Sequence, residues 1–97
     1  MNYCNIVGTG SFLPEIEVTN DDLRERLSAT APDFVDKMEM ASGILKRWRA
    51  PEGWAASDLA QRAATEALLR AEKVATDVDL IILGTDSPDY LTPATSV

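Results

Sequence analysis

The sequence predicts an α/β fold, because a long amphipathic helix leads directly into an apolar run. Residues 79–84 follow that helix without alternating polarity, as expected of a strand covered on both faces. This order favours a parallel pair of strands with a right-handed crossover. In residues 57–73 the apolar positions fall on one helical face: Ala60, Ala63, Ala64, Ala67, Leu68 and Ala71.

The first elements are predicted from strand, turn and capping signals. Residues 3–8 indicate a short strand, which Gly8-Thr9-Gly10-Ser11 ends, and Pro14 follows in a loop. Thr19 or Asn20 then caps a helix that runs to about Leu27. Acidic side chains in its first turn suit the helix dipole.

Two more helices and one strand follow. Pro32 suits the first turn of a second helix, which runs to about Ala41 and ends at Gly43 in a left-handed conformation. Residues 44–49 indicate a strand, before a turn marked by a proline and a glycine. Ser57 is the expected cap of the long alanine-rich helix, which has an acidic residue at its first helical position and runs to about Lys73.

Length and charge narrow the classes of function. The 97 residues make one small domain at most, with 45% hydrophobic and 26% charged residues. The net charge of −7 argues against binding to nucleic acid or to an anionic membrane, because both need clustered lysine and arginine. No apolar run approaches the length of a transmembrane helix, and the N-terminus lacks the basic region of a signal peptide.

Cysteine and histidine are scarce. Cys4 is the single cysteine, so no internal disulfide can form and the expected compartment is the cytoplasm. Histidine is absent, which removes the commonest general base and argues against a zinc site. With no histidine to activate it, Cys4 is expected to be a small buried hydrophobe in the first strand.

Three motifs have both a chemical and a structural interpretation. Gly8-Thr9-Gly10 lacks the third glycine of a dinucleotide loop and the Gly-Lys-Ser/Thr of a P-loop, so a structural turn is favoured. Asp86 and Asp89 flank Pro88 and could act as acid and base, but capping of turns or of the next helix fits better.

The third motif is a basic and aromatic cluster. Lys46, Arg47 and Arg49 surround Trp48. Arg47 and Trp48 could contact a phosphate, as in coenzyme A or a phosphopantetheine carrier. The alternative is a solvated strand edge with the tryptophan packed on the core.

Six segments follow one another in an order that is typical of a known family: Ile6–Pro14, Thr19–Leu23, Ser42–Ile44, Ser57–Ala60, Asp77–Thr85 and Ser87–Pro93. Together they resemble the start of the β-ketoacyl-acyl-carrier-protein synthase III family. The resemblance implies the thiolase fold, of which this chain would be the N-terminal portion of the first α/β half, and it covers essentially the whole chain.

The resemblance also implies an activity, decarboxylative Claisen condensation. A cysteine thiolate takes an acyl group from coenzyme A, and a malonyl unit on acyl carrier protein loses carbon dioxide and attacks the acyl-enzyme. A histidine and an asparagine assist, and oxyanion-hole donors hold the developing charge. None of these catalytic residues matches a position here, since the nucleophile is expected after a helix that begins near Pro93, past Val97.

Substrates and partners follow from the same resemblance. Acyl-coenzyme A and acyl-carrier-protein thioesters are the expected substrates, with no permanently bound cofactor or metal, and a homodimer is expected. Lys37 and Ala41 stand where members that load from coenzyme A have tryptophan and arginine, so acetyl priming is in doubt. A shifted alignment could place Trp48 or Trp54 near the ligand. Thr92 precedes the motif proline and implies room for a longer acyl group in the partner subunit's pocket.

Two non-enzymatic alternatives remain open at this stage. The chain could be a non-catalytic short or split subunit that pairs with a separate catalytic chain. It could also be a free-standing α/β binding module, although the Leu80–Leu83 strand would then have an uncovered edge. The reading frame past Val97 discriminates between the first alternative and an enzyme segment.

Overall fold

The chain divides into two units in the computed structural model, which describes residues 2–92, 95 and 96. The hairpin unit comprises Pro14–Pro51. The α3 unit comprises the residues up to Leu13 and those from Glu52 onward. The elements in chain order are β1 (Ile16–Thr19), α1 (Asn20–Leu27), α2 (Phe34–Ser42), β2 (Lys46–Arg49), α3 (Ala56–Arg70) and a 3-10 turn, η1 (Ala75–Asp77).

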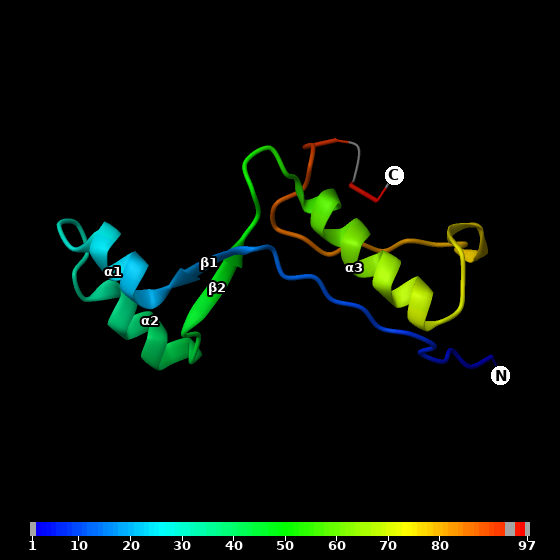
Figure 1. Ribbon diagram of the computed structural model, residues 1–97, viewed down its shortest axis with the longest axis horizontal. Helices are drawn as coiled ribbons and strands as arrows, with labels where there is room; N and C mark the ends of the chain where they lie inside the picture. Colours follow the sequence, from blue (N-terminus) through cyan, green and yellow to red (C-terminus); the bar gives the residue numbers. More distant parts are fainter. Residues whose placement is uncertain (1, 93–94, 97) are drawn as a thin grey trace. The chain divides into compact units, whose positions relative to one another are not determined.

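In the hairpin unit, β1 and β2 pair antiparallel, with Ile16 opposite Arg49 and Thr19 opposite Lys46. Figure 1 shows α1 and α2 next to each other at one end of this two-stranded ribbon. The sequence analysis missed β1, although Ile16-Glu17-Val18-Thr19 alternates in polarity as an edge strand does. The strand predicted over residues 44–49 is confirmed for Lys46–Arg49.

Local signals set the two helices of the hairpin unit. The predicted cap at Thr19 is confirmed: Asp22 N–H donates to Thr19 Oγ1 at 3.2 Å, and Thr19 N–H donates to Asp22 Oδ2 at 2.9 Å. This capping box fixes the start of α1. The predicted second helix begins at Phe34, two residues after Pro32, and ends as expected at Gly43, whose φ is 72°.

Arg24 on α1 forms hydrogen bonds and ion pairs with acidic side chains of α2. Its guanidinium donates to Asp36 at 2.9 Å, and to Asp21 and Glu39 at 2.7 Å each. These hydrogen bonds, with Asp36 first, raise the pKa of Arg24 above its usual value. Val35 on α2 is 4% exposed, and among the other described residues of this unit Pro14 is also buried. The hairpin unit is therefore stabilised by hydrogen bonds between polar side chains as well as by a very small apolar core.

In the α3 unit the predicted alanine face of the long helix is confirmed as a packing surface. A Cβ built at Gly8 would lie 2.6 Å from the Ala67 carbonyl oxygen and 2.9 Å from Ala71 Cβ. A Cβ at Gly10 would lie 2.6 Å from the Ala67 nitrogen. Gly8-Thr9-Gly10 is therefore structural, as expected, and its glycines permit close approach of the N-terminal segment to α3.

The start of α3 differs from the expectation. Its cap is Ala55 rather than Ser57, and Asp58 Oδ2 accepts from the Ala55 N–H at 2.7 Å. Because alanine has no side-chain acceptor, another residue must satisfy the next donor. Asp89 Oδ1 accepts from the Ser57 N–H at 3.1 Å. Asp89 thus has the structural role that the sequence favoured, although it caps the preceding helix.

The predicted strands 3–8 and 79–84, and their parallel pairing, are not formed among the described residues. Ile6 is 89% exposed and Ile82 is 86% exposed. A parallel strand needs neighbours on its edges and layers on both faces, and these residues supply α3 alone. The same lack of cover leaves Cys4 exposed, so its predicted burial is wrong.

The end of α3 also differs, since the helix stops at Arg70 instead of Lys73. Lys73 N–H donates to the Leu68 carbonyl at 2.9 Å, and Glu72 N–H donates to the Leu69 carbonyl at 3.2 Å. This is a Schellman motif, which requires a left-handed residue, and Glu72 has a φ of 56°.

Glu72→Gly is therefore expected to raise the free energy of unfolding by about 0.5–1 kcal/mol, because glycine has no Cβ penalty in the left-handed region. Chemical denaturation of the intact protein measures the change. The matched control is Lys73→Gly, where φ is not positive and no gain is expected. Equal effects of the two substitutions would contradict the prediction.

Candidate functional site

The basic cluster predicted around Trp48 lies on β2, and its side chains divide between two faces of the hairpin. Lys46 Nζ lies 5.2 Å from the centroid of the Trp48 ring and 3.6 Å from Glu17 Oε1. Successive side chains of a strand alternate between faces. Arg47 and Arg49 therefore share the opposite face with Val18 and Ile16, their partners in the register.

Arg47 is held by a buried amide. Asn20 is 5% exposed, and its Oδ1 accepts from Arg47 Nη2 at 2.7 Å. Asn20 Nδ2 donates to Glu39 Oε2 at 2.7 Å and to the Ile44 carbonyl at 2.8 Å. The Asn20 amide thereby connects α1, α2 and the segment that enters β2.

Arg47 is nevertheless not fully satisfied. Its Nη1 is buried and has no hydrogen-bond partner in the part of the chain that the structure describes. A buried guanidinium nitrogen without an acceptor is costly, so such a group calls for an oxygen acceptor. The predicted phosphate contact of Arg47 and Trp48 remains a prediction.

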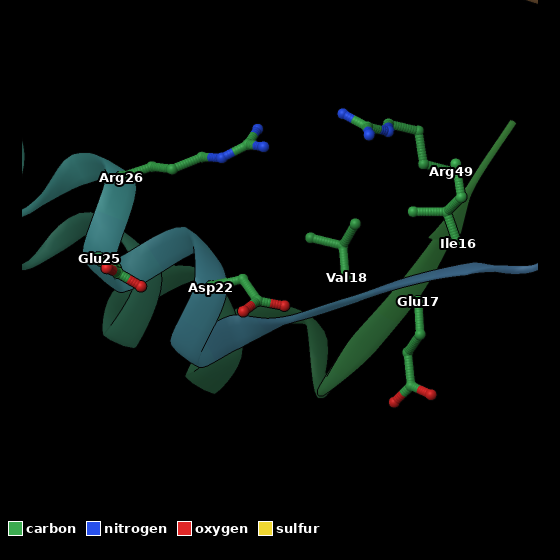
Figure 2. Close-up of a pocket in the computed structure, with 7 residues that line it drawn as sticks. All are labelled: Ile16, Glu17, Val18, Asp22, Glu25, Arg26 and Arg49. Carbon is green, nitrogen blue, oxygen red and sulfur yellow. The ribbon is translucent and has the colours of Figure 1, made fainter. Parts of the chain in front are cut away.

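The remaining arginine of the cluster, Arg49, lines a cleft of about 410 Å³ together with Arg26 of α1. Figure 2 shows the guanidinium groups of Arg26 and Arg49 pointing toward each other above Ile16 and Val18. We call this the Arg26–Arg49 cleft, and it is also lined by Glu17, Asp22 and Glu25. The sequence analysis included Arg49 in the basic cluster but missed Arg26. Arg26 lies on α1, far from Arg49 in the sequence, and the two meet only after β1 and β2 have paired.

Asp22 is an acid of the cleft, and its surroundings lower its pKa. The pKa of Asp22 is lowered first by the hydrogen bond from the Thr19 backbone, then by that with the Thr19 side chain, and further by the charge of Arg26. Its carboxylate therefore stays ionised to a lower pH than an ordinary aspartate. It also remains engaged in the capping box.

The α3 unit has a second aromatic and cationic cluster. Phe12 and Trp54 stack with their ring centroids 6.1 Å apart, and the Arg62 guanidinium lies 3.8 Å from the Trp54 centroid. This contact holds the N-terminal segment and the segment before α3 at one helix. Trp54 is thus engaged within the protein.

Other classes of site are not found in the described residues. No group of three or more potential metal-ligating side chains occurs there. No helix among these residues is long and apolar enough to cross a membrane.

The chain is similar to known proteins along almost all of its length. No protein-family model matches it. It is 40% identical over 96 residues to a β-ketoacyl-[acyl-carrier-protein] synthase III of Alkalilimnicola ehrlichii, covering 99% of this chain and 28% of that protein. It is 43% identical over 94 residues to a protein of the same name from Xylella fastidiosa, covering 97% of this chain and 28% of the relative.

Solved structures agree with the sequence relatives. Xanthomonas campestris OleA superposes with a TM-score of 0.79 at 30% identity, over 94% of this chain and 28% of that one. The 3-oxoacyl-[acyl-carrier-protein] synthase III of Aquifex aeolicus gives 0.73 at 37% identity, over 93% of this chain and 28% of that one. Over nearly its whole length the chain matches a segment of β-ketoacyl-acyl-carrier-protein synthase III-like condensing enzymes.

The fold is accordingly that of the thiolase-like synthases, and the chain spans about 28% of the length of the relatives that it matches. For a synthase III-like chain, the residue of interest before the motif proline is Thr92, which is exposed in the structure. Pro93 and the start of the helix expected there lie outside the described residues. The role of Thr92 in an acyl pocket therefore remains a prediction.

Proposed function

We propose that the protein carrying this chain is an acyltransferase that joins an acyl thioester to malonyl-acyl carrier protein by decarboxylative Claisen condensation. The observation that supports this most strongly is 40% identity, along 99% of the chain, to a protein named β-ketoacyl-[acyl-carrier-protein] synthase III. The product would be a 3-oxoacyl thioester, used in fatty-acid synthesis or a related lipid or secondary-metabolite pathway.

The proposed reaction has two covalent stages. A cysteine thiolate attacks the acyl thioester carbonyl, and coenzyme A leaves as its thiol. The carboxyl carbon–carbon bond of the malonyl group then breaks, carbon dioxide leaves, and the electron pair stays on the α-carbon. That carbon attacks the acyl-enzyme carbonyl and releases the cysteine, while hydrogen-bond donors stabilise the oxyanion.

The nucleophile, histidine and asparagine of this proposal are assigned to residues outside these 97. The chain contains no histidine, and its one cysteine, Cys4, is exposed in the N-terminal segment. The described residues would serve as scaffold, through the close packing of the N-terminal segment on α3 and the Asn20 network. Acyl carrier protein and a coenzyme A thioester are the proposed partners, and a homodimer is the proposed assembly.

Donor length tests the proposed acyl pocket. Threonine at position 92 is smaller than phenylalanine and leaves room for a longer acyl group, so kcat/KM of the natural protein should be higher for octanoyl- than for acetyl-coenzyme A. Mass spectrometry of the 3-oxoacyl product measures both rates. Thr92→Phe should lower the octanoyl rate selectively, whereas Thr85→Phe, in the preceding loop, should leave the ratio unchanged. A native preference for acetyl donors would sink the pocket proposal.

A second candidate is a non-catalytic subunit that pairs with a separate catalytic chain. It is favoured by the lack of histidine and of a cysteine with a neighbouring base in these residues. The intact mass of the native product, compared with its reading frame past Val97, separates the two. A longer product that condenses substrates alone supports the enzyme, and activity that needs a second polypeptide supports the subunit.

A further inference from the structure

The Arg26–Arg49 cleft contains two exposed guanidinium groups. Neither Arg26 nor Arg49 forms a salt bridge or a side-chain hydrogen bond with another of the described residues. They come from different elements, α1 and β2, yet Figure 2 shows their ends converging over one space.

The acids around the cleft do not fill this role. Asp22 is engaged with Thr19 in the capping box. Glu17 points away from the guanidinium groups in Figure 2 and pairs with Lys46 across the hairpin. Glu25 lies beside its own helix in the same view. The guanidinium groups therefore keep their donors available to an external acceptor.

The floor of the cleft is apolar. Ile16 and Val18 are half-buried, and Figure 2 shows Val18 below the space between the two guanidinium groups and Ile16 below Arg49. A small inorganic anion would leave this surface uncovered, whereas a ligand with a hydrocarbon part would cover it. The volume of about 410 Å³ lies within the usual range of small-molecule sites.

Charge balance selects the kind of anion. Three acids and two arginines line the cleft, and one of the acids, Glu17, pairs with Lys46. Asp22 and Glu25 then offset the charges of Arg26 and Arg49, so the cleft is close to neutral before a ligand binds. A dianionic phosphate ester would add two negative charges near these acids, and a monocarboxylate adds one. A carboxylate also matches the planar fork of arginine.

We propose that the Arg26–Arg49 cleft binds an amphipathic monocarboxylate, with its carboxylate between the two guanidinium groups and its hydrocarbon chain on Ile16 and Val18. The site does not use Thr92, Arg47 or any residue of the α3 unit. The proposal therefore stands or falls separately from the condensing activity.

Sodium octanoate is the probe, added to the intact natural protein. The site-resolved readout is nuclear magnetic resonance of the arginine Nε–Hε groups, so that octanoate bound elsewhere is not counted. We expect the Arg26 and Arg49 signals to shift together along one saturable curve. Arg26→Gln and Arg49→Gln should each weaken that binding about tenfold, because each removes a charge-assisted hydrogen bond.

Matched controls separate the contributions of charge and of apolar contact. Lys37→Gln removes an exposed positive charge from α2 outside the cleft and should leave octanoate binding unchanged. Octanol should not shift either arginine, and acetate and inorganic phosphate should bind more weakly than octanoate. Unshifted arginine signals, unchanged affinity in both arginine variants, or phosphate binding as tight as that of octanoate would each overturn the proposal.

Discussion

Replacing Gly10 with alanine is expected to lower the free energy of unfolding by about 3 kcal/mol, the upper part of the range for overpacked cores. A Cβ at this position meets the Ala63 carbonyl oxygen and the Ala67 nitrogen, both in the backbone of α3. Backbone atoms inside a helix cannot rotate away, so the N-terminal segment must separate from the helix. Chemical denaturation of the intact protein measures the loss.

Gly84→Ala is the matched control for this prediction. No atom lies within 4 Å of the Cβ that it adds, and the φ of Gly84 is not positive. The change should therefore be close to neutral. If Gly10→Ala behaved like Gly84→Ala, the close packing of the N-terminal segment on α3 would not describe the protein in solution.

Asn20→Ala is the second change with a large expected effect, a loss of about 3 kcal/mol in the free energy of unfolding. It removes the acceptor of Arg47 Nη2 and the donor to the Ile44 carbonyl. Arg47 Nη1 already lacks a partner within the described residues, so the guanidinium would lose its one internal acceptor. The cost comes mainly from buried polar groups left unpaired.

Asn5→Ala gives the corresponding control, because Asn5 is exposed in the other unit. It should change stability by no more than about 0.5 kcal/mol. Amide hydrogen exchange adds a local readout: in Asn20→Ala, protection should fall in α1, α2 and β2. A loss for Asn20→Ala no greater than for Asn5→Ala would show that the network contributes little.

Helices were predicted better than strands. The cap at Thr19 and the left-handed end at Gly43 depend on neighbours within a few residues, and both are confirmed. The ends of α3 were missed for a physical reason. Asp89, 32 residues after Ser57, supplies the acceptor at its start, and a left-handed glutamate, which sequence disfavours, ends it.

The candidate cleft shows the same limit. The basic cluster on residues 46–49 was visible in the sequence, including Arg49. Which of its side chains faces Arg26 depends on the antiparallel register, and shifting a strand by one residue exchanges its two faces. The register is known only from the pairing of β2 with β1, a strand that the sequence analysis did not predict.

The sequence by itself determined the family, the helical segments and the alanine face of α3, because these depend on local spacing and on the order of motifs. The tertiary structure decided that the glycines of residues 8–10 permit close packing, that Asn20 holds Arg47, and that Arg26 and Arg49 share a cleft. Each of these contacts joins residues far apart in the chain. Their geometry follows from pairing and packing, which no local pattern encodes.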